Sequence, residues 1–222
     1  MFDRDRHRWN RARPGLPRTA RDVTLSGVWA RPVAIRPVPP FAVIDRSVLE
    51  RIEEELSQAG EGADTILDAA FDRFEDRQPE LAEHVASVLD RPLDETATAL
   101  GSFLSIVVFM AFERAFEGRL GEVDGDALKA TVDAVSLEEE LRAQRPREPL
   151  DLEDVIAQEQ PGIVDFIHVH LEAALDDGTG DHDVDVDDVH LVYQTMLVLV
   201  LALSHAVEPD ERSKKRSTEL LA

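Results

Sequence analysis

The stretch ATALGSFLSIVVFMAF, residues 97–112, runs for sixteen residues without a charged side chain. A second such stretch, VHLVYQTMLVLVLALSHAV at residues 189–207, is nineteen residues long, and only His190 and His205 in it can titrate near neutral pH. A helix that is apolar on every side is typical of the centre of a soluble helical bundle. We therefore predict that the two stretches form long core helices inside an all-α protein.

A Gln-Pro step precedes each long stretch, at Gln78-Pro79 and at Gln160-Pro161. Proline is well tolerated in the first turn of a helix, so each step predicts a new helix that starts at the proline. The shared order of elements predicts an internal duplication, with repeats at 64–117 and 151–206 that form two similar helical hairpins. Apolar positions correspond as well, since Leu81, Val85 and Leu89 match Ile163, Ile167 and Leu171. The alternative is chance, because any two amphipathic helices share apolar spacing.

The segment from residue 41 to residue 207 has helical patterning almost throughout. Apolar residues at helical spacing, with start and stop signals between them, divide it into about seven helices. Ser47 and Asp187 are the side chains that we expect to cap the first and the last helix. The chain has 222 residues, 43% of them apolar, and can bury a substantial core. The predicted fold class is therefore an all-α helical bundle.

Residues 1–40 differ from the rest of the chain in charge and in proline content. They hold nine arginines and three aspartates, and Pro37, Pro39 and Pro40 favour an extended, polyproline-like backbone. We predict a disordered basic arm there, followed by the helical domain at 41–207 and a flexible tail at 208–222. Two other interpretations of the arm stay open: it folds back on the acidic body, or it binds nucleic acid through its arginines and Trp9.

The net charge of −22 is concentrated outside the arm. Residues 41–222 carry fifteen Lys or Arg side chains and forty-three Asp or Glu side chains. Such an acidic surface repels nucleic acid and anionic membranes, which argues against either as a partner of the folded part. We predict a protein partner or self-association, with nucleic acid bound only through the arm at 1–40. The chain has no cysteine, which excludes disulfides and thiolate metal sites, and a cytoplasmic location is the simplest fit.

The length of the two apolar stretches raises the question of a membrane. About twenty apolar residues span a bilayer, and the stretch at 189–207 comes close to that length. The stretch at 97–112 is shorter, and it carries Gly101, Ser102 and Ser105. The other predicted helices are amphipathic and need an apolar surface to pack on. We therefore predict core helices and keep membrane association as an alternative.

Two pairs of candidate metal ligands occur, Asp165 with His168 and Asp187 with His190. A spacing of three places both side chains of a pair on one face of a helix, as in the di-metal sites of four-helix bundles. About one residue in five is acidic, so such spacings also arise by chance. A metal-dependent helical-bundle enzyme that uses these four residues is therefore an alternative function.

The sequence contains no glycine-rich phosphate loop, nucleophile elbow or His-Glu-x-x-His motif. We accordingly predict no catalytic residue and no cofactor. The leading prediction is a non-enzymatic protein-interaction or regulatory module. Its support is this lack of catalytic motifs, together with the separation of a basic arm from an acidic body.

Overall fold

The computed structural model describes residues 36–144, 152–176 and 185–210. These residues form eight α-helices and no β-strand, with one isolated antiparallel bridge between Leu120 and Val207. The predicted all-α class is confirmed, with one helix more than the predicted number of about seven. The predicted arm up to residue 35 and the predicted tail from residue 211 lie outside the described residues. The helices are α1 (Arg46–Ala59), α2 (Ala63–Arg77), α3 (Pro79–Leu89), α4 (Glu95–Ala115), α5 (Gly125–Gln144), α6 (Leu152–Glu159), α7 (Pro161–Asp176) and α8 (Val186–Ala206).

Two helix starts differ slightly from the sequence prediction. Asp45 caps α1, because its side chain accepts a hydrogen bond from the backbone N–H of Ser47. Asp185 caps α8 in the same way, by accepting from the N–H of Asp187. In both cases the predicted cap, Ser47 or Asp187, is the second residue of the helix. Successive polar residues compete for the capping role, and here the earlier carboxylate takes it.

The two Gln-Pro steps separate helices as predicted. Gln78 has an extended φ of −137°, so α2 ends before it and Pro79 starts α3. Gln160 likewise lies between the end of α6 and Pro161, the first residue of α7. A proline disfavours helical geometry in the residue before it and accepts the first helical position, which explains both breaks.

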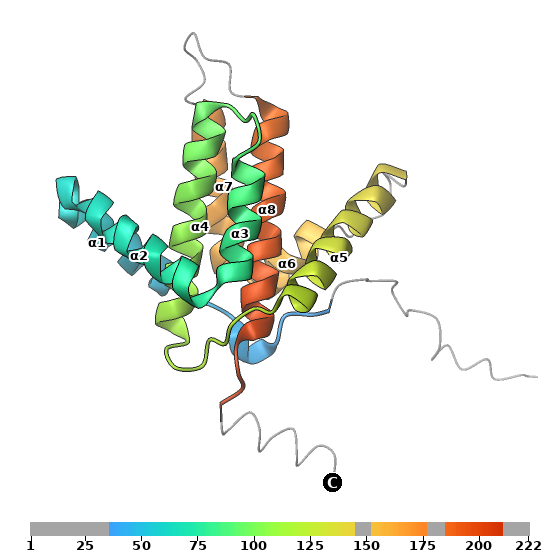
Figure 1. The fold of residues 1–222 in the computed structure, drawn as a ribbon, viewed down its shortest axis with the longest axis horizontal. Coiled ribbons are helices and arrows are strands. Elements are labelled where there is room, and N and C mark those ends of the chain that lie inside the picture. Colours follow the sequence, from blue (N-terminus) through green and yellow to red (C-terminus); the bar gives the residue numbers. More distant parts are fainter. Residues whose placement is uncertain (1–35, 145–151, 177–184, 211–222) are drawn as a thin grey trace, which may run out of the picture. The chain divides into compact units, whose positions relative to one another are not determined.

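The long helices α4 and α8 lie side by side at the centre of the described bundle (Figure 1). α3 and α7 pack against this pair, while α1 and α2 extend on one side and α5 and α6 on the other (Figure 1). Most side chains of α8 from Val192 to Ser204 are buried, as are those of α4 from Val107 to Phe112. The core is thus centred on the two stretches that the sequence singled out.

Both central helices are also long and apolar enough to cross a membrane, with 21 residues and a mean hydropathy of 1.6 each. Within the most apolar 18 residues of each helix, 56% of α4 and 72% of α8 are buried by the other helices. Core helices of soluble proteins show the same combination of length and burial, so the finding is weak evidence for a membrane. It agrees with the prediction that both are core helices.

The packed body begins before the predicted boundary at residue 40. Val38 is buried, and its backbone N–H donates a 2.7 Å hydrogen bond to Oε2 of Glu159. The short 3-10 helix Pro40–Ala42 follows directly, and Ala42 is fully buried. The prolines there do favour an extended chain, as predicted. An extended chain can still pack, because its free N–H and C=O groups pair with side chains of the helices.

Candidate functional site

The eight helices fall into two successive sets of four, which we call the first half (residues 36–117, α1–α4) and the second half (residues 118–210, α5–α8). The contacts between the halves are reciprocal. α1 of the first half packs on α7 of the second, and α5 of the second half packs on α3 of the first. The central α4–α8 pair joins the last helix of each half.

Two buried glutamines hold the halves together. Gln78 donates from Nε2 to the carbonyl oxygen of Gly121 at 2.8 Å and accepts at Oε1 from the N–H of Val123 at 2.8 Å. Gln160 donates from Nε2 to the carbonyl oxygen of Ala42 at 2.6 Å and accepts at Oε1 from the N–H of Ile44 at 3.0 Å. Each glutamine thus binds two alternate residues in the segment that leads into the first helix of the other half.

Residues at matching positions of α4 and α8 meet each other. Ser105 Oγ lies 4.0 Å from Sδ of Met196. A Cβ atom placed on Gly101 would lie 3.3 Å from Cγ2 of Val192. The two residues of each pair are separated along the sequence by the same number of residues as Asp94 and Asp185, which cap α4 and α8. Such a constant interval means that the two helices run parallel and in register.

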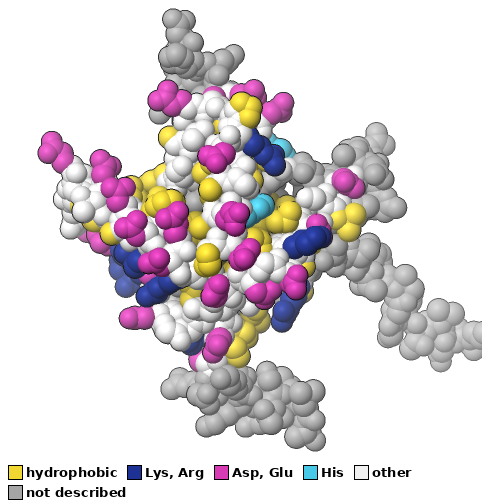
Figure 2. All heavy atoms as spheres, viewed as in Figure 1, with side chains coloured by type: hydrophobic (Ala, Val, Ile, Leu, Met, Phe, Trp, Pro, Cys, Tyr) yellow, Lys and Arg dark blue, Asp and Glu magenta, His cyan; other side chains and the backbone are white. Residues whose placement is uncertain are grey.

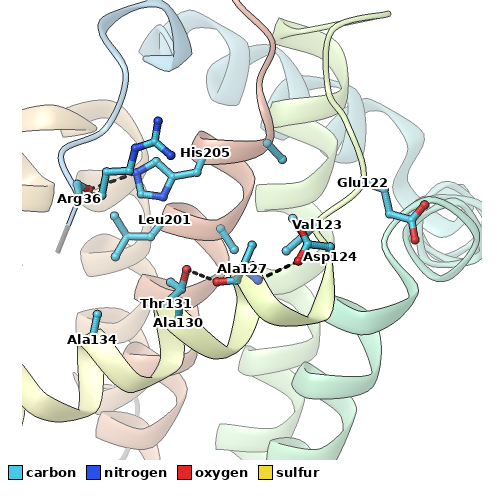
Figure 3. Close-up of a pocket in the computed structure, with 12 residues that line it drawn as sticks. Arg36, Glu122, Val123, Asp124, Ala127, Ala130, Thr131, Ala134, Leu201 and His205 are labelled. Carbon is cyan, nitrogen blue, oxygen red and sulfur yellow. Dashed lines mark hydrogen bonds between the residues drawn. The ribbon is translucent and has the colours of Figure 1, made fainter. Parts of the chain in front are cut away.

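A groove of about 400 Å³ lies between α5 and α8, and we call it the α5–α8 groove. Figure 3 shows Arg36 and His205 toward one end of it and Glu122 and Asp124 toward the other. Small or apolar side chains make up most of the remainder. The lining residues are Arg36, Glu122, Val123, Asp124, Ala127, Ala130, Thr131, Ala134, Leu201, Ala202, His205 and Ala206.

Comparison of the halves explains why there is space in this groove. Asp45 directly precedes α1, and Asp124 directly precedes α5. We therefore compare the two helices position by position, counting from these two aspartates. Val48 and Ile52 of α1 are buried, with exposed fractions of 7% and 0%. The α5 residues at the same two positions are Ala127 and Thr131, which are smaller. The second half is therefore open where the first half is filled.

The charged side chains also differ between the α1–α4 contact of the first half and the α5–α8 groove of the second half. Arg114 near the end of α4 pairs with Glu55 of α1, with 2.6 Å between Nη1 and Oε2. His205 stands at the matching position of α8, and Ala134 stands at the position of Glu55. The α5–α8 groove therefore has basic groups at one end but lacks the carboxylate that α1 supplies in the first half.

His205 also anchors the start of the described chain at the groove. Its Nε2 lies 3.1 Å from the carbonyl oxygen of Arg36 and 3.2 Å from that of Pro37. Both partners are acceptors, so Nε2 carries the proton and donates to them. The backbone at Arg36 is thereby held against the last turn of α8, beside the groove.

Three of the four predicted metal ligands contact other side chains. Asp165 forms an ion pair with Arg46 of α1. His168 Nε2 lies 3.1 Å from the hydroxyl of Tyr193, and His190 Nε2 lies 2.9 Å from Nε2 of Gln194. Among the described residues, no group of three or more His, Cys, Asp or Glu side chains is placed to hold a metal ion. The metal site predicted from Asp165, His168, Asp187 and His190 thus gains no geometric support.

Sequence reasoning did not predict the α5–α8 groove. A signal was present, because Ala127, Ala130 and Ala134 recur at helical spacing on a helix with an acidic back. Alanine is an ordinary helix residue, and only its position opposite α8 gives it a role here. Figure 2 shows acidic side chains spread over the visible face, as the net charge of −22 leads one to expect. Comparison of the chain with protein-family models, with curated proteins and with solved structures finds no match.

Proposed function

We propose that the chain is a non-enzymatic protein-interaction or regulatory module that binds its partner in the α5–α8 groove. The observation that carries the proposal is the groove itself, with its largely apolar lining and Arg36 and His205 at one end. Concave, mostly apolar sites with a few polar groups are the usual form of binding sites. A short segment of another protein would cover this apolar surface and gain orientation from the basic end.

The first half supports a specific chemistry for this partner. There, the matching space is taken by two branched aliphatic side chains, Val48 and Ile52, and by the carboxylate of Glu55 against Arg114. A segment that completes the second half in the same way has a branched aliphatic residue and an acidic residue. Its carboxylate would lie near the guanidinium of Arg36, where a charge-assisted hydrogen bond is favourable.

The same comparison supports the predicted duplication, which we extend to all four helices of each half. The reciprocal glutamine contacts and the register of α4 with α8 are what a pseudo-twofold axis along that helix pair would produce. On this proposal the first half has kept a closed contact between α1 and α4, and the corresponding contact between α5 and α8 in the second half has opened. The open contact then became the binding surface.

The test uses the full chain as bait, with one variant inside the groove and one outside it. Ala130→Glu places a charge on the groove wall, and Ser136→Glu places the same charge on the exposed surface of α5. We expect wild type and Ser136→Glu to capture the same partner, and Ala130→Glu to lose it. Light scattering on the same proteins shows whether the captured partner is a second copy of the chain. Equal capture by both variants, or no capture by wild type, would overturn the proposal.

A further inference from the structure

We propose that Arg36 and His205 form a carboxylate-binding subsite at the basic end of the α5–α8 groove, and that His205 binds the carboxylate only when both of its ring nitrogens are protonated. This inference rests on the proposed function, because it concerns the chemistry and the regulation of the same groove. The carboxylate is that of an acidic residue in the partner segment. Partner binding then becomes tighter as the pH falls below neutral.

The first argument comes from the matching positions of the two halves. Arg114 of α4 pairs with Glu55 of α1, with 2.6 Å between Nη1 and Oε2. In the second half His205 replaces this arginine and Ala134 replaces this glutamate, and both line the groove. The second half thus keeps a basic side chain at this place, lacks the carboxylate, and has groove volume beside Ala134. A carboxylate from a partner would complete the ion pair that the first half makes by itself.

The second argument is how the proton of the neutral His205 ring is used. Nε2 lies 3.1 Å from the carbonyl oxygen of Arg36 and 3.2 Å from that of Pro37, so its N–H is directed to the backbone. Nδ1 of the neutral ring then carries a lone pair, which repels a carboxylate. Protonation turns Nδ1 into a donor and gives the ring a positive charge, while Nε2 keeps its backbone acceptors. A carboxylate therefore gains a charge-assisted partner only in the protonated state.

The third argument is the set of charged groups around this end of the groove. Figure 3 shows Arg36 toward the same end as His205, with Glu122 and Asp124 toward the other end. An anion bound between the two basic groups would offset their mutual repulsion, so the carboxylate and the second proton favour each other's binding. The charged residues that line the groove or lie in the segments next to it are Arg36, Arg119, Glu122, Asp124, Glu159 and Glu208.

The exchange of arginine for histidine gives the contact in the second half its pH dependence. An arginine side chain stays charged throughout the physiological range, whereas a histidine changes its charge between about pH 5 and pH 8. The Arg114–Glu55 pair of the first half is therefore permanent. The subsite at His205 binds a carboxylate in proportion to the protonated fraction of its ring.

The first test uses isocaproate as the probe, because it joins a branched aliphatic chain to a carboxylate. Its matched control is isocaproamide, which has the same shape without the charge. The ring signals of His205 in the full chain are titrated by NMR from pH 8 to pH 5.5 with each compound. We expect isocaproate to raise the midpoint of the His205 titration by about 0.5 pH unit, a threefold gain in proton affinity, and the amide to leave it unchanged. Equal shifts with both compounds, or no shift with isocaproate, would overturn the proposal.

The second test replaces His205 with the residue that the first half has. His205→Arg keeps its charge at every pH, and His190→Arg places the same charge near the opposite end of α8 as the control. We expect wild type and His190→Arg to bind isocaproate at least about fivefold more weakly at pH 8 than at pH 6, because the neutral ring prevails at pH 8. His205→Arg should bind it equally at both pH values. A His205→Arg protein that keeps the pH dependence would overturn the proposal, and the wild-type titration stands whether or not this variant folds.

Partner capture by the same proteins separates this inference from the proposed function. Capture by wild type should be stronger at pH 6 than at pH 8, and capture by His205→Arg should not change. Coupling seen with isocaproate but not with the captured partner would overturn the assignment to the partner's carboxylate. If isocaproate and its amide act alike while Ala130→Glu abolishes capture, the subsite is wrong and the binding groove stands. If only isocaproate shifts His205 and capture ignores Ala130→Glu, the subsite stands and the proposed function fails.

Discussion

Gln78 and Gln160 make the same pair of backbone hydrogen bonds from opposite halves of the molecule. Each stands immediately before a proline that starts a helix, and each is buried, with exposed fractions of 1% and 0%. The side-chain amide is suited to this role because it carries both a donor and an acceptor. Each half therefore completes the backbone hydrogen bonding of the other, and the halves depend on one another for stability.

We expect Gln78→Leu and Gln160→Leu each to lower the free energy of unfolding by about 2–4 kcal/mol. Leucine keeps the volume but leaves one N–H and one C=O in a buried place without a partner, and each orphaned group costs about 1–3 kcal/mol. Urea unfolding followed by circular dichroism measures the change. Gln58→Leu is the control, since Gln58 is exposed on α1 and its side chain bonds to Glu54 of its own helix. Similar losses for Gln58 and the buried pair would contradict the role of the glutamines.

Gly101 permits the close contact of α4 with its neighbours. A Cβ there would lie 2.5 Å from Cδ2 of Leu89 and 3.3 Å from Cγ2 of Val192. We expect Gly101→Ala to destabilise the protein by about 1–2 kcal/mol, because the cost of overpacking exceeds the gain of up to about 1 kcal/mol in helix propensity.

The matching test is a double-mutant cycle with Leu89→Ala, which removes the nearest colliding atoms. In that background Gly101→Ala should be neutral or stabilising, as measured by urea unfolding. Additive effects of the two substitutions would show that the Leu89 contact is not the reason for glycine.

His84 gives the protein a predictable pH dependence. Burial on α3 lowers the pKa of this histidine from its ordinary value of 6.5, and the nearby charge of Arg91 lowers it further. The unfolded chain therefore binds a proton more tightly than the folded protein does. The contribution of His84 to stability is present above pH 6.5 and is lost as the pH falls from 6.5 toward the lower folded pKa.

The variant His84→Phe tests this point, because phenylalanine occupies the matching position of α7 at Phe166. Between pH 8 and pH 5.5, we expect the variant to lose less stability than wild type in urea unfolding. Titration of His84 by NMR should show a pKa below 6.5, whereas a value above it would contradict the expectation.

Transfer of residues from the first half should close the groove. The double variant Ala127→Val with Thr131→Ile gives α5 the side chains that α1 has at Val48 and Ile52. We expect it to fold normally, since both positions face a groove with free volume, and to capture partner at least about tenfold more weakly. Ser136→Val on the exposed surface of α5 is the control. Undiminished capture by a folded double variant would show that the partner binds elsewhere.

Gln78 and Gln160 also show which features could be predicted from the sequence and which could not. The steps at Gln78-Pro79 and Gln160-Pro161 predict helix starts, and these starts are found. The proline carries that prediction, because its effect on the neighbouring backbone is local. Nothing local indicates that the glutamine side chains are buried, since their partners at Val123 and Ile44 lie 45 and 116 residues away.

What the sequence by itself determined is the all-α class and the two central helices, α4 and α8. Uncharged stretches of that length must be covered, and helical periodicity is set by neighbouring residues. Only the tertiary structure decided where the candidate site lies. The α5–α8 groove exists because alanines of α5 face Leu201 and His205 of α8 where the first half has larger side chains. Such a space is a property of two surfaces brought together, and neither helix contains it alone.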